Sequence, residues 1–305
     1  MSRTPAQIEK ASAVEVKGWF GAHKWLLARR AAQLGFLALF VTGPWFGLWI
    51  TKGTLASSLT FDVLPLTDPF IALQTLAAGH PLETTALIGV AIVVAGYVLV
   101  GGRVYCSWVC PINPVTDLAA WLRNRYGLDK GWQPPNSLRL WLIGGALMAS
   151  AVSGTVAWEW INPVTVLHRG IVFGTLVTGL GGLLVIAVFA FDLGVSKHGW
   201  CGHVCPVGAF YSLIGRIAVL RVSAAKRAAC DDCMDCFRVC PEPQVITPAL
   251  KAEAPVSPVI LASDCTNCGR CIDVCAKDVF RFALRGDRRE EIGGDADETE
   301  IRKVA

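Results

Sequence analysis

Residues 230–241 read CDDCMDCFRVCP, and residues 265–276 read CTNCGRCIDVCA. Both segments have the spacing C-x2-C-x2-C-x3-C, which is the spacing of bacterial ferredoxins with two clusters. Three closely spaced thiolates can surround one iron–sulfur cubane from a loop, while the fourth points toward the other cluster. The repeated spacing therefore predicts two [4Fe-4S] clusters in a small α+β, bacterial-type ferredoxin domain over residues 226–285.

The exchange of the fourth cysteine predicts which thiols hold each cluster. Cluster 1 is expected to be held by Cys230, Cys233, Cys236 and Cys275. Cluster 2 is expected to be held by Cys265, Cys268, Cys271 and Cys240. Structural zinc also uses C-x2-C pairs, but two such pairs explain neither the third nor the fourth cysteine of each motif. Between the motifs, residues 245–246 and 259–261 are expected to form short strands.

Four uncharged apolar runs precede the ferredoxin motifs, at about residues 31–51, 84–102, 140–158 and 170–191. Charged residues make up 17% of the chain, below the roughly 25% that is usual for soluble domains, and mean hydropathy is +0.48. Each run has about the 20 apolar residues that a transmembrane helix needs. The sequence thus predicts an all-α membrane domain of four transmembrane helices over residues 31–225, after a cytoplasmic tail over residues 1–30.

Lysine and arginine are unevenly distributed between the runs, and this asymmetry predicts the orientation in the membrane. The first and third connecting loops contain only Lys52 and Arg169, whereas residues 1–30, the second loop and the C-terminal part are rich in basic residues. Both termini are therefore expected in the cytoplasm, in a multi-pass protein of a bacterial inner membrane. Residues 286–305 are highly charged, which predicts a disordered tail.

Four further cysteines form two CxxxCP motifs. Cys106 and Cys110 follow the second apolar run, and Cys201 and Cys205 follow the fourth. Residues four apart lie on one face of a helical turn, so we expect the two motifs to present four thiols to one point on the cytoplasmic side. Three interpretations stay open: a third cubane cluster, redox-active thiol pairs, or thiols that are structural or bind another metal.

The order of four apolar runs, two CxxxCP motifs and a double ferredoxin motif resembles a known family. It is similar to the ferredoxin-type membrane subunit of periplasmic nitrate reductase systems, the NapH-type quinol dehydrogenase, over nearly the whole chain. The resemblance implies an electron-transfer subunit that takes electrons from membrane quinol through iron–sulfur centres. The implied acceptors are a periplasmic iron–sulfur partner and, through it, nitrate reductase.

Quinol oxidation needs an apolar cleft and a proton acceptor. The candidates are His80, His168 and Glu159, which lie in the predicted outer loops. Haem is not expected, because the chain has no C-x-x-C-H motif and no histidine within an apolar run. The net charge of +4 gives no indication of nucleic-acid binding.

Two other functions fit the same motifs. A membrane-bound metal reductase, acting in the maturation of a copper enzyme, would use the CxxxCP thiols to bind and reduce the soft metal. A redox-sensing scaffold would instead dock a partner through its charged tail. Relatives of the first kind are longer than this chain, which favours the quinol dehydrogenase.

Overall fold

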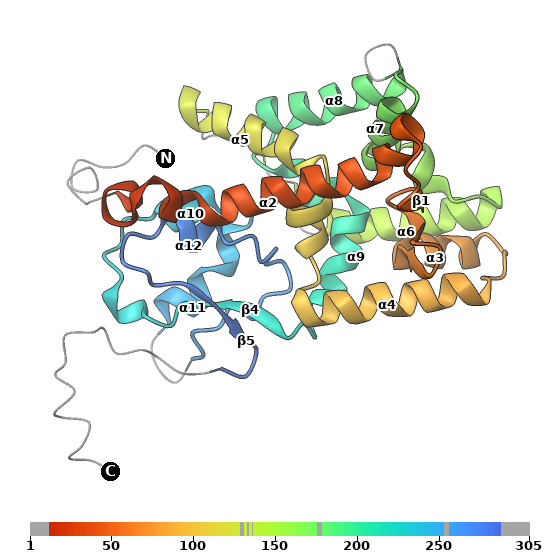
Figure 1. The fold of residues 1–305 in the computed structure, drawn as a ribbon. Helices are drawn as coiled ribbons and strands as arrows, with labels where there is room; N and C mark the ends of the chain where they lie inside the picture. The colour runs from red at the N-terminus through yellow and green to blue at the C-terminus, as the bar shows by residue number, and fades with distance from the viewer. Residues whose placement is uncertain are drawn as a thin grey trace.

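The computed structural model describes residues 12–128, 131–132, 134–135, 137–175, 179–252 and 256–287. The predicted tail over residues 286–305 lies almost entirely outside this part of the chain. Figure 1 shows two regions: a helical part and, beside the N-terminal half of its longest helix, a small region with β4, β5, α10, α11 and α12. The second region carries both ferredoxin motifs.

The helical part is built from apolar helices that correspond only partly to the predicted runs. Their bounds are α2 Ala13–Phe46, α3 Pro69–Ala77, α4 Thr84–Val100, α5 Asn113–Tyr126, α6 Leu138–Ser153, α7 Pro163–Val172, α8 Leu180–Gly194 and α9 Pro206–Gly215. Within the described ranges, α2 is the one helix long and apolar enough to cross a membrane by itself. Helices α4, α6, α8 and α9 are apolar but shorter.

Helix α2 begins much earlier than the sequence predicted. Ser12 and Glu15 form a capping box, in which the Ser12 hydroxyl accepts the Glu15 backbone N–H and the Glu15 carboxylate accepts that of Ser12. The helix is kinked at Gly18, whose φ is +73°. Residues 13–30, which the sequence assigned to a cytoplasmic tail, are therefore helical and extend α2 toward the ferredoxin motifs.

The prediction of an all-α membrane domain is also wrong, because a three-stranded antiparallel sheet follows α2. Its strands are β1 Thr51–Gly53, β2 Ser57–Thr60 and β3 Leu64–Thr67, in the order β1-β2-β3. Helix α2 stops at Phe46 because Gly47 adopts the left-handed conformation with φ +73°. Strand β3 approaches α4 at Gly89, where a Cβ atom would lie 3.0 Å from the backbone nitrogen of Thr67.

The fourth apolar run is not one helix. Helix α7 ends at Val172 and α8 begins at Leu180, so the prediction of a single span over residues 170–191 is wrong. Gly174, with φ +67°, lies in the break. Gly181 lets α8 lie close to α7, since a Cβ atom there would be 2.8 Å from the carbonyl oxygen of Val166.

The ferredoxin region contains a two-stranded antiparallel sheet, β4 Leu220–Ser223 and β5 Arg281–Leu284, in which Leu220 pairs with Leu284. Its helices are α10 Asp235–Val239, α11 Thr247–Lys251 and α12 Arg270–Val274. The strand predicted at residues 245–246 is wrong, because Pro243–Val245 form a 3-10 turn. At residues 259–261 the structure has an isolated bridge between Val259 and Ser223.

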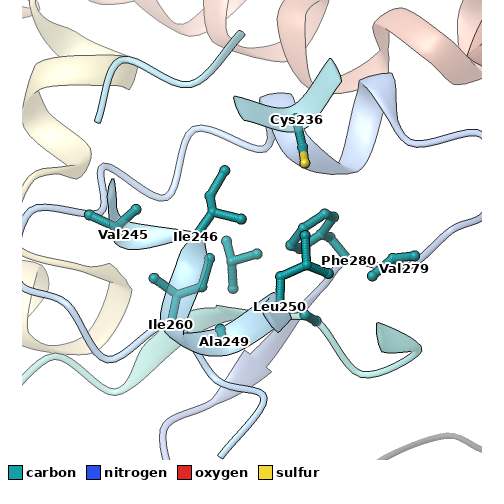
Figure 2. Close-up of a cluster of buried hydrophobic side chains, with 10 residues drawn as sticks. Cys236, Val245, Ile246, Ala249, Leu250, Ile260, Val279 and Phe280 are labelled. Carbon is teal, nitrogen blue, oxygen red and sulfur yellow. The ribbon is translucent and has the colours of Figure 1, made fainter. Parts of the chain in front are cut away.

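The core of the ferredoxin region is a compact apolar cluster beneath the cysteines. Ile246, Leu250, Ile260 and Phe280 are each at most 6% exposed. In Figure 2 the sulfur of Cys236 points toward this cluster from above. The packing therefore surrounds the thiols with apolar atoms and holds the loops that carry them.

Candidate iron–sulfur sites

The first ferredoxin cavity is lined by all four cysteines predicted for cluster 1, Cys230, Cys233, Cys236 and Cys275. The first three come from the loop before α10 and its start, and Cys275 follows α12. The structure thus brings the last cysteine of the second motif to the first. This arrangement is the exchange that two-cluster ferredoxins use.

The second ferredoxin cavity is lined by Cys265, Cys268, Cys271 and Cys240. Its loop repeats the backbone of the first: φ is +60° at Asp232 and +47° at Asn267, and +63° at Met234 and +73° at Gly269. These left-handed residues occupy equivalent positions in the two motifs. Backbone conformation and cysteine spacing therefore follow the same internal two-fold repeat.

Burial disfavours the thiolate form of several ferredoxin cysteines. Burial raises the pKa of Cys230, although the backbone N–H of Asp232 partly opposes the shift. Burial likewise raises the pKa of Cys236 to about 12 and that of Cys265 to about 11. Binding of iron at these sites would therefore release protons, as is usual for thiolate ligands.

The third thiol cavity is lined by the four CxxxCP cysteines, Cys106, Cys110, Cys201 and Cys205. Each motif forms a single π-helical turn, in which the Cys110 N–H donates to Tyr105 O at 2.9 Å and the Cys205 N–H to Trp200 O at 2.8 Å. Such turns are rare and are frequent at functional sites. The sequence predicted the convergence of the thiols but not the π turns.

Arg103 joins the third cavity to the ferredoxin region, although no motif in the sequence identifies this residue. Its side chain is 1% exposed and donates to Glu242 Oε1 at 2.8 Å, to Asp264 O at 3.0 Å and to Cys201 O at 2.8 Å. A buried charge of this kind is tolerated only when it is paired and hydrogen-bonded. Arg103 therefore fixes one CxxxCP motif against the loop of the second ferredoxin cavity.

Two further hydrogen bonds hold the same junction. The Ser107 hydroxyl donates to Thr266 O at 2.8 Å, and the Trp108 indole N–H donates to Asn267 O at 3.1 Å. Thr266 and Asn267 lie between the cysteines of the second motif. The second ferredoxin cavity and the third thiol cavity are thus direct neighbours, as electron transfer between two centres would need.

The three thiol sets suit a cluster better than a single ion. A zinc ion is held by thiolates at about 2.3 Å. In the part of the chain that the structure describes, no three Cys, His, Asp or Glu side chains lie close enough together to hold a single metal ion. Each set instead surrounds a cavity, and all twelve cysteines are free thiols. This donor set and arrangement fit [4Fe-4S] ligation.

The structure does not bring the three candidate quinol residues together. Glu159 lines the third thiol cavity, where its carboxylate accepts hydrogen bonds from Asn162 and Thr165, both at 2.7 Å. His168 is buried on α7 against Phe40 and is not among the residues that line that cavity. His80 lies on an exposed turn, with its ring hydrogen-bonded to Gly154 O.

Models of two iron–sulfur families match the chain. A 4Fe-4S dicluster domain matches residues 229–279, and a 4Fe-4S binding domain matches residues 82–129 and 175–224, which contain the CxxxCP motifs. These matches and the three thiol cavities define an iron–sulfur electron-transfer protein. No solved structure matches the chain.

The chain belongs to the family of NapH and MauN ferredoxin-type proteins. It is 50% identical to the ferredoxin-type protein NapH of Escherichia coli K12, covering 90% of this chain and 94% of that protein. It is 52% identical to the methylamine utilization ferredoxin-type protein MauN of Paracoccus denitrificans, covering 88% and 93%. The predicted resemblance to NapH is therefore confirmed.

Proposed function

We propose that this protein is a quinol dehydrogenase subunit of a bacterial inner membrane. It passes electrons from quinol through iron–sulfur centres toward a periplasmic iron–sulfur partner and a nitrate reductase. The observation that carries the proposal is the third thiol cavity, which lies within the apolar helical part and against the ferredoxin region. A cluster there would connect a membrane donor to the ferredoxin clusters.

Each thiol set would hold one cluster in this proposal. Cluster 1 uses Cys230, Cys233, Cys236 and Cys275, cluster 2 uses Cys265, Cys268, Cys271 and Cys240, and the third uses Cys106, Cys110, Cys201 and Cys205. The match of a 4Fe-4S binding domain to both CxxxCP segments supports the third cluster over redox-active thiol pairs. The clusters accept and release single electrons, and the protein sets their potentials through burial and hydrogen bonds to sulfur.

The proposed topology keeps four spans, built on α2, α4, α6 and α8, with both termini in the cytoplasm. Helices α4, α6 and α8 have 17, 16 and 15 residues, so each rises about 23–26 Å at 1.5 Å per residue. A bilayer core is about 30 Å thick, so the adjoining turns would complete each crossing. Exposed apolar side chains on these helices, such as Leu99, Trp141 and Ile186, support contact with lipid.

The lining of the third cavity supports a route across the membrane. Leu55 and Glu159 come from segments predicted on the outer side, and Cys106 and Cys201 from segments predicted on the inner side. The outer segments therefore fold back toward the CxxxCP motifs. An electron on a cluster in this cavity would have less far to travel to a periplasmic partner than one in the ferredoxin region.

The proposal is tested by anaerobic purification in lipid nanodiscs, followed by addition of a reduced quinol and electron paramagnetic resonance. We expect reduced-cluster signals with quinol alone. Signals that appear only with dithionite would show that quinol cannot reduce the clusters, and would contradict the proposal.

A second candidate is an electron-transfer role in methylamine utilization, favoured by the 52% identity to MauN. The two candidates share the clusters and differ in the partner that receives the electrons. Deletion of the gene in its own host separates them: loss of growth by nitrate respiration supports the first, and loss of growth on methylamine supports the second.

A further inference from the structure

A second apolar cavity lies beside the third thiol cavity, and we call it the tyrosine cavity. Its volume is about 450 Å³, and its walls come from α2, the β1–β3 sheet, α4 and α9. Three of the chain's four tyrosines, Tyr97, Tyr105 and Tyr211, line it. Its size and its apolar walls with few polar groups are typical of a site for a small organic ligand.

The tyrosine cavity and the third thiol cavity share part of one wall. Leu55, Asp68 and Tyr105 line both cavities. Tyr105 also precedes Cys106 and accepts the hydrogen bond that closes the first π turn. A ligand in the tyrosine cavity would therefore be separated from the CxxxCP thiols by little more than one side chain.

Asp68 is the acidic group of the tyrosine cavity. It is 9% exposed, and its Oδ1 accepts the backbone N–H groups of Phe70 and Ile71 at 2.8 and 3.1 Å, which caps α3. Its Oδ2 accepts the Tyr211 hydroxyl at 2.8 Å. One carboxylate oxygen is thus held by the helix, and the other is paired with a hydroxyl that can relay a proton.

The tyrosine rings form a compact group at this wall. Tyr105 and Tyr211 are stacked with ring centroids 5.2 Å apart, and Tyr97 meets Tyr211 edge-on at 4.9 Å. Tyr211 is 1% exposed. Rings fixed in this way offer aromatic faces to a planar ligand at little cost in conformational entropy.

We propose that the tyrosine cavity binds the head group of quinol and that Asp68 is its proton acceptor. This inference rests on the proposed function and replaces the sequence candidates with a defined site. Oxidation breaks the two O–H bonds of the quinol and yields quinone, two protons and two electrons. For each proton, the quinol hydroxyl would protonate Tyr211 as Tyr211 donates its own proton to Asp68, and Asp68 would then release that proton to water. The two electrons would be taken up one at a time by the oxidised iron–sulfur cluster proposed at the CxxxCP thiols.

A larger groove of about 690 Å³ lies on the ferredoxin side and is the competing location. It is lined by Arg29, Arg30, Asp117 and Arg270, among others. Asp117 pairs with Arg30 and Arg270, both at 2.5 Å. This charged lining is poorly suited to an uncharged quinol, so the groove serves as the alternative outcome of the mapping experiment below.

The Asp68→Asn variant tests proton acceptance separately from structure. Asparagine is also a good N-cap: its one oxygen can still cap α3, while its amide N–H group donates to the Tyr211 oxygen, and it cannot take up a proton. We expect quinol binding to change less than about two-fold and quinol-driven cluster reduction to slow about 100-fold, within the range for a lost general base. Tyr126→Phe, at a tyrosine outside the cavity, is the control. An Asp68→Asn rate equal to that of the control would overturn the assignment.

The Gly96→Phe variant tests the location without touching Asp68. Gly96 lines the cavity, and a Cβ atom there meets nothing within 4 Å, so a phenylalanine would enter the site. Gly144→Phe on α6, which is equally open, is the matched control. Binding is measured with a fluorescence-quenching quinone analogue. We expect affinity to fall at least about ten-fold in Gly96→Phe and to stay unchanged in Gly144→Phe; equal affinities would contradict the site.

Photolabelling with an azidoquinone then separates failure of the site from failure of the function. Label on α4 or the β1–β3 segment supports the site, and label at the groove beside Trp121 overturns it. If wild-type clusters are reduced by quinol but both variants behave as wild type, the site is wrong and the function stands. If wild-type clusters are never reduced by quinol, the proposed function itself fails.

Discussion

The ferredoxin region and the third thiol cavity hold cysteines in different ways. The ferredoxin region takes all eight of its cysteines from residues 230–275 and packs them on its own apolar core. The third cavity collects four cysteines from two distant motifs, and polar contacts at the junction with the ferredoxin region hold both motifs in place. The cysteines of the ferredoxin region are therefore held by local structure, whereas those of the third cavity depend on contacts between distant segments.

The largest difference is expected between Cys271→Ser and Cys106→Ser, which each remove one cysteine. Cys271 packs against the ferredoxin core, so loss of its cluster also removes folding free energy from that region. We expect proteolysis within residues 226–285 to rise about 100-fold in Cys271→Ser, since cluster binding supplies much of the folding free energy of small metal-binding domains. In Cys106→Ser this cleavage should stay at the wild-type rate. Equal cleavage in both variants would contradict the difference between the two regions.

Arg103→Met tests whether the third cavity depends on the junction. The substitution leaves Glu242 buried without its cation, which costs about 3–5 kcal/mol when a buried pair is broken. We expect the third site to lose its iron while both ferredoxin sites keep theirs, as measured by iron analysis and electron paramagnetic resonance. Arg125→Met, at an exposed arginine of α5, should leave every site loaded. Retention of the third site in Arg103→Met would contradict the account.

Asp117→Asn concerns a second polar contact between the two regions. Asp117 on α5 accepts from Arg30 on α2 and from Arg270 on α12, both at 2.5 Å. Loss of these charge-assisted bonds should cost about 1.5–3 kcal/mol, measured by hydrogen exchange of α12. The control is Asp62→Asn, at an exposed carboxylate of the β2–β3 turn, which should leave α12 unchanged. An unchanged exchange rate in Asp117→Asn would contradict a docking role for Asp117 and leave docking to the other contacts between the regions.

The smallest effect is expected from Asp278→Asn. Asp278 pairs with Lys17 at 2.5 Å but is 63% exposed, and exposed ion pairs contribute about 0–1 kcal/mol. The free energy of unfolding should therefore change by less than about 1 kcal/mol in chemical denaturation. A change as large as that of Asp117→Asn would show that the kinked start of α2 contributes more to docking than its surface contacts suggest.

Cysteine spacing predicts which neighbouring thiols share a loop or a turn. The repeated ferredoxin motif predicted the exchange of the fourth cysteine, and the position of each CxxxCP motif after an apolar run predicted that the two pairs meet. The start of α2 could also have been found, since Ser12 and Glu15 have the spacing of a capping box. The basic residues that follow were instead interpreted as a tail. The π turns gave no such signal, because a CxxxC spacing fits an ordinary helical turn equally well.

Other features depend on contacts that one sequence does not reveal. Asp68 and Tyr211 are 143 positions apart, and neither residue has a neighbour that identifies the other. In the sequence, Arg103 is only one of the basic residues of the second connecting loop, whereas the structure buries it against Glu242. The break between α7 and α8 occurs in an uninterrupted apolar run, where glycine at 174 and 179 favours a break and close packing equally.

The central claim is that the CxxxCP thiols hold a third cluster between quinol and the ferredoxin region. The most direct measurement is the iron and sulfide content of the anaerobically purified full chain, together with its Mössbauer spectrum. We expect about 12 iron atoms per chain, four for each of three cubane clusters, and about eight in Cys201→Ser. About eight iron atoms in both proteins would contradict the account, because the ferredoxin cysteines alone would then hold all of the iron.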